Sequence, residues 1–416
     1  MITFLTISIV AAGFLAYGLA MRWLRDAPVT GPLLFGAFGL VLSQLGLLQS
    51  DGEHQVLHLL AEVTLILVLF SDAAHIDLRQ LRSDHNLPVR MLVIGLPLCV
   101  VLGAVVAMFV FPDFGFWETV LLAAILAPTD AALGQAVVSN SRVPVRIRQT
   151  LNVESGLNDG LALPAVLALV AIASMMDAAG TDTGRWLIFA LQQLGGGTLA
   201  GVFVGFVVAT LAKRASARGR LRESAEGIVA LATAALAYTL AEVIHGNGFV
   251  AAFIGGIVFG NTLGFGCRYL YEFAETEGQL FTLGTFFLFG ALLLPEALAH
   301  FTAADVLYAV ASLTVIRMLP VALSLLGTGV SATTTLFLGW FGPRGLASIL
   351  FVLLILDMGE VANSERILHV VVLTVALSIL LHGVTAAPFA NRYAVFAERM
   401  PDCAEKKPVP DQPFQT

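Results

Sequence analysis

Long apolar stretches alternate with short polar ones along the whole chain. A helix needs about 20 apolar residues to cross the hydrocarbon layer of a membrane, and thirteen stretches approach this length. The pattern therefore predicts an all-α polytopic membrane protein with thirteen transmembrane helices. The predicted spans cover residues 2–24, 31–48, 56–76, 88–111, 117–139, 149–176, 185–212, 225–244, 247–262, 279–295, 303–326, 332–356 and 367–390.

The composition supports a membrane protein. Of the 416 residues, 58% are hydrophobic and 12% are charged, whereas soluble domains carry about 25% charged residues. The first residues lack the basic segment and cleavage motif of a signal peptide, so we expect the first helix to be retained. Cys99, Cys267 and Cys403 have no metal-binding or redox spacing and receive no role.

The basic residues predict the orientation, because Lys and Arg collect in cytoplasmic loops. With the N-terminus outside and the C-terminus cytoplasmic, 18 of the 22 basic residues fall on the inside. Arg185 and Arg366 fall outside, and Arg317 and Arg344 fall within predicted helices. The inside set is Arg22, Arg25, Arg79, Arg82, Arg90, Arg142, Arg146, Arg148, Lys213, Arg214, Arg218, Arg220, Arg222, Arg268, Arg392, Arg399, Lys406 and Lys407.

Two predicted helices are interrupted near their middles. Pro128 and Thr129 interrupt the span 117–139, and Gly342-Pro343-Arg344-Gly345 interrupts the span 332–356. Each break removes backbone hydrogen bonds that lipid cannot replace. The two helices are seven spans apart, so they cross the membrane in opposite directions. Interrupted helices in inverted repeats indicate a transporter with its site at the membrane midplane.

Three carboxylates lie inside these apolar segments. Asp130 follows the first break, and Glu154 and Asp159 lie in the span 149–176. An ionisable group in hydrocarbon costs about 2.5–3.5 kcal/mol even on the lenient insertion scale, so such groups are rare without a function. We interpret this stretch as a cation and proton site.

Helical geometry divides the charged helix into two faces, because residues four apart share a face. Ser155 and Asp159 point one way, and we expect them to face Asp130 and bind Na⁺ through hard oxygen ligands. An oxygen-only ligand set argues against copper, zinc or iron.

Glu154 and Asn158 lie about 100° round the same helix. We expect them to face an arginine as a structural pair, with Arg317 and Arg344 as the candidates. Outside this cluster, Glu62 lies in the span 56–76, where it fits an access path or a packing role equally well.

Several other functions are disfavoured. The sequence contains no GxxxxGK[ST] motif, so nucleotide hydrolysis is not the expected energy source. We expect no cofactor and no nucleic-acid partner. An enzyme is disfavoured because no nucleophile–base arrangement appears, and a symporter of an organic anion because paired carboxylates would repel it. The ligand types do not separate Na⁺ from Li⁺ or K⁺, so a K⁺/H⁺ antiporter stays open as the alternative.

Several motifs carry a family resemblance. The runs Ala127-Pro-Thr-Asp-Ala-Ala-Leu-Gly-Gln-Ala136 and Arg148-Gln-Thr-Leu-Asn-Val-Glu-Ser-Gly-Leu-Asn-Asp-Gly160 closely resemble the monovalent cation:proton antiporter-1 family, the NhaP-like and NHE-like sodium/proton antiporters. The arginine before Pro320 and the Gly342–Gly345 motif extend the resemblance over nearly the whole chain.

The resemblance implies Asp159 as the principal carrier of cation and proton, assisted by Asp130, Ser155 and Thr129. The resemblance also implies that Glu154 pairs with an arginine of the core, and we favour Arg317 over Arg344. Family members with Asn-Asp at this point are generally electroneutral, so Asn158 suggests one cation for one proton.

The resemblance also implies an NhaA/NhaP-like antiporter fold and a homodimer, in which a six-helix core slides against a dimerisation domain. A long regulatory tail is absent from the sequence, so we expect a prokaryotic source and a bacterial inner membrane. The implied divisions are residues 1–87 (dimerisation), 88–176 (core), 177–302 (linker and dimerisation), 303–392 (core) and 393–416 (cytoplasmic tail).

Overall fold

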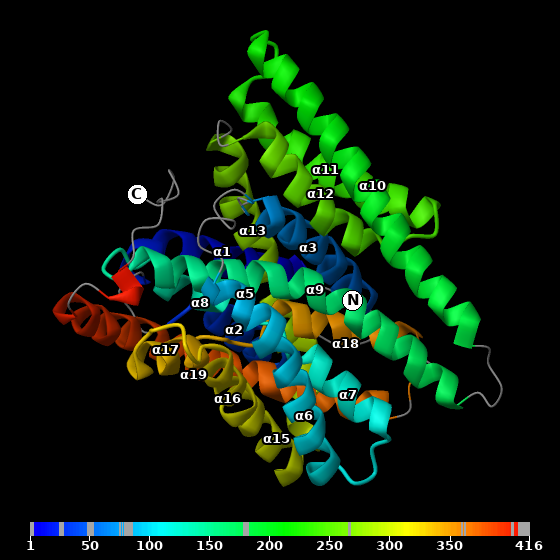
Figure 1. The fold of residues 1–416 in the computed structure, drawn as a ribbon, viewed down its shortest axis with the longest axis vertical. Coiled ribbons are helices and arrows are strands. Elements are labelled where there is room, and N and C mark those ends of the chain that lie inside the picture. The colour runs from blue at the N-terminus through cyan, green and yellow to red at the C-terminus, as the bar shows by residue number, and fades with distance from the viewer. Residues whose placement is uncertain are drawn as a thin grey trace.

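The computed structural model of the chain describes residues 4–24, 29–47, 54–74, 76, 78, 86–177, 183–264, 268–358, 361, 363–400 and 403–406 (Figure 1). Every regular element within these residues is a helix, which confirms the predicted all-α fold class. Four members of the basic pattern, Arg25, Arg79, Arg82 and Lys407, lie outside the described residues.

Two π-helical turns, η1 and η2, interrupt α-helical runs within the described residues. The elements are α1 (Phe4–Leu24), α2 (Gly31–Gln44), α3 (His54–Ala74), α5 (Asn86–Arg90), η1 (Met91–Gly95), α6 (Leu96–Val110), α7 (Phe116–Ile125), α8 (Ala131–Val138), α9 (Val145–Asp177), α10 (Thr183–Ala217), α11 (Glu223–Val243), α12 (Gly248–Leu263), α13 (Arg268–Leu288), η2 (Phe289–Leu293), α14 (Leu294–His300), α15 (Ala303–Leu313), α16 (Val315–Ser324), α17 (Ala332–Trp340), α18 (Leu346–Met358), α19 (Ser364–Arg399) and η3 (Ala404–Lys406).

Length and composition suit these helices to a membrane. In the described residues, eight helical segments are long and apolar enough to cross it, and α2, α7 and α12 are shorter apolar helices. The two predicted interruptions are confirmed, because α7 and α8 flank residues 126–130 while α17 and α18 flank residues 341–345. The exact number of thirteen spans stays a prediction.

A third interruption was not predicted. The sequence suggested one continuous helix over residues 303–326, but the chain bends at Thr314, where φ is −115° and ψ is −94°. The hydroxyl of Thr314 donates to the carbonyl oxygen of Val310 at 2.6 Å, a type of bond that often bends helices. The bend separates α15 from α16, which carries Arg317.

The C-terminal region has more structure than the sequence indicated. The last helix, predicted to end near residue 390, runs to Arg399. The short turn η3 then packs against α17, where Oε1 of Glu405 accepts hydrogen bonds from the Ser331 backbone N–H at 2.7 Å and the Thr334 hydroxyl at 2.9 Å.

The helices form two groups that meet along α9, α18 and α19, where α9 contacts α3 and α12, α18 contacts α3, and α19 contacts α2 and α14. The scaffold group contains α1–α3 and α10–α14, and the site group contains α5–α9 and α15–α19. In Figure 1, α10–α12 lie at the upper right, α6, α7, α15 and α16 lie at the bottom, and α9 crosses between them. The grouping resembles the expected core and dimerisation domains, whose functional division stays a prediction.

Candidate functional site

The two breaks touch each other beside α9. Residues 126–130, which we call break one, and residues 341–345, which we call break two, are non-helical. They are joined directly, because the backbone N–H of Asp130 donates to the carbonyl oxygen of Pro343 at 2.8 Å. The two interrupted helices therefore contact each other at their breaks.

Asp130 of break one satisfies backbone donors at the starts of two half-helices. Its Oδ2 accepts from the N–H of Leu346 at 2.7 Å, and its Oδ1 accepts from the N–H of Leu133 at 3.4 Å. Both N–H groups lie in the first turn of a helix, which leaves its N–H groups unpaired and carries a partial positive charge. A Cβ atom at Gly345 would overlap the Asp130 carboxylate, so this contact requires glycine.

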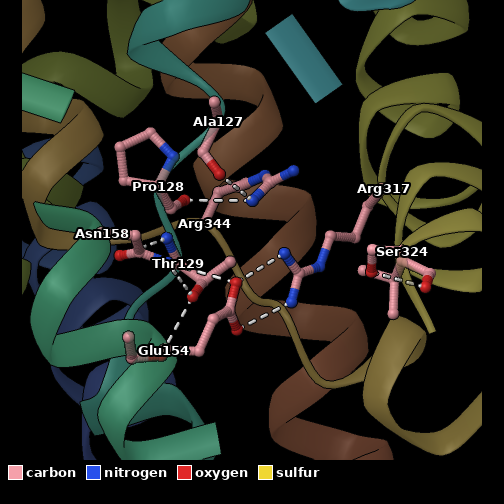
Figure 2. A network of polar contacts seen from close by, with 10 residues as sticks. Ala127, Pro128, Thr129, Glu154, Asn158, Arg317, Ser324 and Arg344 are labelled. Carbon is pink, nitrogen blue, oxygen red and sulfur yellow. Dashed lines mark hydrogen bonds and ion pairs between the residues drawn. The ribbon is translucent and has the colours of Figure 1, made fainter. Parts of the chain in front are cut away.

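Arg344 of break two performs the converse role at break one. Its Nη1 donates to the carbonyl oxygens of Ala127 at 2.7 Å and Pro128 at 3.0 Å (Figure 2). These carbonyls follow the C-terminal end of α7, where backbone acceptors are unpaired and the helix dipole is negative. Each break thus supplies the charge that the other needs.

Glu154 forms a buried, bidentate ion pair with Arg317. Nη1 and Nη2 of Arg317 donate to Oε1 and Oε2 of Glu154 at 2.7 and 2.8 Å (Figure 2). Both side chains are 1% exposed. The structure therefore pairs Glu154 with Arg317, while Arg344 binds the carbonyls of break one.

Asn158 connects this ion pair to break one. Its Nδ2 donates to Oγ1 of Thr129 at 2.7 Å and to Oε1 of Glu154 at 3.4 Å, and its Oδ1 accepts from the Thr129 N–H at 3.3 Å. We expected Asn158 to face an arginine together with Glu154, but it contacts the glutamate and Thr129. The Ser155 hydroxyl also lies 2.9 Å from Oγ1 of Thr129.

Asp159 lies in the same helix with a different environment. The residue is 9% exposed, and its buried Oδ1 atom has no hydrogen-bond partner in the described part of the chain. Asp130, Asp72 and Glu154 are close enough for their charges to repel it. A buried carboxylate oxygen without a donor is costly, so this atom is suited to a proton or a cation.

Asp72 lies further along the same predicted span as Glu62, where the sequence fits an access path as well as an end-of-helix or packing role. A Cβ atom at Gly156 would lie 3.8 Å from Cβ of Asp72, so α3 brings Asp72 against α9 at Gly156. An acidic residue in an apolar helix is the signal at both positions, and it does not show which of Asp72 and Glu62 lies near the cation site. Ten residues of helix separate the two by about 15 Å.

Glu62 belongs to another contact. Its Oε1 atom accepts a hydrogen bond from the hydroxyl of Tyr238, which joins α3 to α11 within the scaffold group. Its proposed place on an access path stays a prediction. Likewise, the ligand roles assigned to Asp130, Ser155, Asp159 and Thr129 are compatible with this geometry and stay predictions.

Comparison with known proteins places this arrangement among cation transporters. The Na(+)/H(+) antiporter NhaP of Pseudomonas aeruginosa is 27% identical over 404 residues, which cover 89% of this chain and 92% of that protein. The K(+)/H(+) antiporter NhaP2 of a Shewanella species is 23% identical over 363 residues, and the match spans 86% of this chain but 62% of that relative.

The fold has a close counterpart of known structure. The sodium proton antiporter MjNhaP1 from Methanocaldococcus jannaschii, at pH 8, matches with a TM-score of 0.77 and 19% identity, covering 95% of this chain and all of that one. The family model "Sodium/hydrogen exchanger, transmembrane" matches residues 6–392. This protein is thus a member of the sodium/hydrogen exchanger family, a family of membrane-embedded cation/proton antiporters and not of enzymes.

Proposed function

We propose that this chain exchanges Na⁺ for H⁺ across the membrane, one for one, with cation and proton competing for Asp159. The observation that carries the proposal is the buried Oδ1 atom of Asp159, which has no hydrogen-bond partner among the described residues. Glu154, on the same helix, has both oxygens paired with Arg317 and is therefore unsuited to release and rebind ions.

The remaining ligands come from neighbouring oxygens. Ser155 lies one turn from Asp159 on α9, and its hydroxyl contacts Thr129 of break one. Asp130 accepts two backbone hydrogen bonds, but a carboxylate has about four acceptor positions and can also bind a cation. Oxygen ligands of this kind suit a small hard cation, and we propose no cofactor beyond the two substrates.

Competition at one carboxylate is sufficient for coupling. A bare charge moving through the low-dielectric interior is the expensive state, so the core crosses only when Asp159 carries a proton or a cation. We propose that residues 88–176 and 303–392 form this moving core. Residues 1–87 and 177–302 then form the dimerisation domain and the linker, and residues 393–416 form a cytoplasmic tail.

We further propose a homodimer in the bacterial inner membrane, with the N-terminus outside and the C-terminus cytoplasmic. The asymmetry of Lys and Arg supports this orientation. Asn158 preceding Asp159 supports electroneutral exchange by the family resemblance. K⁺/H⁺ exchange is the second candidate, because relatives with 23% identity are named K(+)/H(+) antiporters.

The test is a proteoliposome assay in which a pH-sensitive dye reports proton movement after addition of NaCl, LiCl or KCl. We expect dequenching with Na⁺, unchanged when the membrane voltage is clamped at zero with K⁺ and valinomycin. Asp159→Asn should reduce the signal to that of empty liposomes. A K⁺ response exceeding the Na⁺ response would favour the second candidate, and retained exchange in the variant would refute the role of Asp159.

A further inference from the structure

One face of α19 carries polar side chains that contact break two. Ser378, His382 and Thr385 recur at the spacing of one helical face. Ser378 and His382 are both completely buried. Polar groups this deep in an apolar helix are normally hydrogen-bonded, so their partners show what they do.

These side chains bind the two ends of break two. The backbone N–H of Arg344 donates to the hydroxyl oxygen of Ser378 at 2.7 Å. At the other end, Nε2 of His382 lies 2.9 Å from the carbonyl oxygen of Trp340, the last residue of α17. The indole N–H of Trp340 also donates to the Thr385 hydroxyl at 3.1 Å.

The chemistry of these contacts assigns the histidine tautomer. Both ring nitrogens lie beside carbonyl oxygens, which only accept: Nε2 beside Trp340 and Nδ1 beside Ser378. The Ser378 hydroxyl is a donor beside Nδ1, so in a neutral ring Nε2 carries the hydrogen and donates to Trp340. The Ser378 hydroxyl already accepts from Arg344, which leaves its own hydrogen for Nδ1 of His382 at 3.3 Å. A neutral histidine therefore completes a chain of hydrogen bonds from one end of break two to the other. A proton on Nδ1 would instead donate to the Ser378 carbonyl oxygen, which lies 3.0 Å away, and would interrupt the chain.

Break two in turn fixes break one. The carbonyl of Pro343, the side chain of Arg344 and the N–H of Leu346 are the groups that hold Asp130 and the carbonyls of Ala127 and Pro128. We propose that Ser378 and His382 are positioning residues for the cation site, acting through break two on break one. This inference rests on the proposed exchange function.

A matched pair of variants tests the assignment. The amide nitrogen of His382→Gln reaches the position of Nε2 and retains the donor to Trp340, whereas that of His382→Asn ends near Nδ1 and loses it. We expect His382→Asn to raise the half-saturating Na⁺ concentration about five-fold, the equivalent of one buried hydrogen bond of about 1 kcal/mol. The maximal rate should change less than two-fold, and His382→Gln should stay within two-fold of the wild type.

Two further variants keep the test decisive. Ser378→Ala removes a single oxygen and should shift half-saturation in the same direction as His382→Asn. Thr374→Ala is the control, because Thr374 is buried on the same helix, and among the described residues its hydroxyl bonds only the Val370 carbonyl of that helix, at 2.7 Å. Thr374→Ala should exchange like the wild type.

The outcomes separate the two proposals. The positioning role is overturned if both His382→Asn and Ser378→Ala have the half-saturating Na⁺ concentration of the wild type. It is also overturned if these variants have a lower maximal rate and a lower melting temperature while the half-saturating Na⁺ concentration stays unchanged. Absence of cation-dependent proton flux in the wild type itself would instead overturn the exchange function.

Discussion

Two carboxylates, Glu154 and Asp159, lie on the same helix, α9, and are similarly buried, but they differ in their hydrogen-bond partners. Glu154 is fully buried, and each of its oxygens accepts a hydrogen bond from Arg317. Asp159, five residues later, is 9% exposed and keeps one buried oxygen without a partner among the described residues. The extent of burial therefore does not distinguish the two carboxylates, whereas their hydrogen-bond partners do.

The comparison shows how one helix combines rigidity with exchange. The region around Glu154 joins α9 to α16 through an ion pair that costs much to break. The region around Asp159 faces Asp72 on α3, and its own glycine neighbour, Gly160, packs closely on the Phe253 ring of α12. A fixed pair thus lies next to a carboxylate that is left for the substrates.

The largest expected effect is at Asp159. Asp159→Asn should eliminate exchange and at the same time raise the melting temperature of the detergent-solubilised protein, because it removes a buried charge that three other carboxylates repel. A stabilisation of about 1–2 kcal/mol is the expected magnitude. Scanning fluorimetry measures it, and a clear drop in melting temperature would mean that Asp159 has an unrecognised structural partner.

Glu154→Gln should have the opposite effect on stability. Removing one partner of a buried pair leaves the Arg317 charge uncompensated and costs about 3–5 kcal/mol. The double variant Glu154→Gln/Arg317→Met should recover much of the loss. Glu398→Gln is the control. The side chains of Glu398 and Arg142 form an ion pair at 3.0 Å, but both are about half exposed, so the melting temperature of this variant should equal that of the wild type.

Gly345→Ala tests the contact between break two and Asp130, the third carboxylate of the site. The added Cβ atom overlaps the Asp130 carboxylate, so the hydrogen bond to Leu346 is displaced and a cost of about 1–3 kcal/mol is expected. Exchange should fall along with stability, because the overlap moves the Asp130 carboxylate away from the position at which we propose that it binds the cation. Gly134→Ala on α8 is the matched control, since among the described residues, its own helix backbone and chain neighbours aside, no heavy atom lies within 4 Å of the added Cβ atom. Equal behaviour of the two variants would contradict the proposed contact.

The smallest effect is expected at Glu405, a buried carboxylate outside the membrane-spanning helices. Burial alone would raise its pKa, but hydrogen bonds from the Ser331 backbone, the Cys403 thiol and the Thr334 hydroxyl hold the pKa of Glu405 below its usual value. A carboxylate with a lowered pKa stabilises the folded state above its ordinary pKa of about 4.3, and the contribution disappears as the pH falls through the lower value.

The corresponding variant is Glu405→Gln. Its melting temperature should lie below that of the wild type at pH 7, by the equivalent of about 1 kcal/mol, and the difference should vanish near pH 3. A difference that persists unchanged at low pH would show that the charge of Glu405 does not contribute.

Part of this structure was predictable because it depends on local chemistry. Apolar stretches predicted helices, and Pro128 and the Gly342–Gly345 motif predicted two interruptions, because a missing N–H or a flexible backbone acts within a turn of itself. The bend at Thr314 escaped prediction because the hydroxyl bond that accompanies it is compatible with both straight and bent helices.

The sequence by itself determined that this protein spans a membrane, that two of its helices are broken, and that carboxylates and arginines lie in apolar surroundings. Only the tertiary structure decided which charges meet: Glu154 with Arg317, Asp130 with the start of α18, and Arg344 with the end of α7. Partners 163 to 217 residues apart in the chain are selected by the packing of distant helices, which no local pattern records. The same packing left the Oδ1 atom of Asp159 without a partner among the described residues.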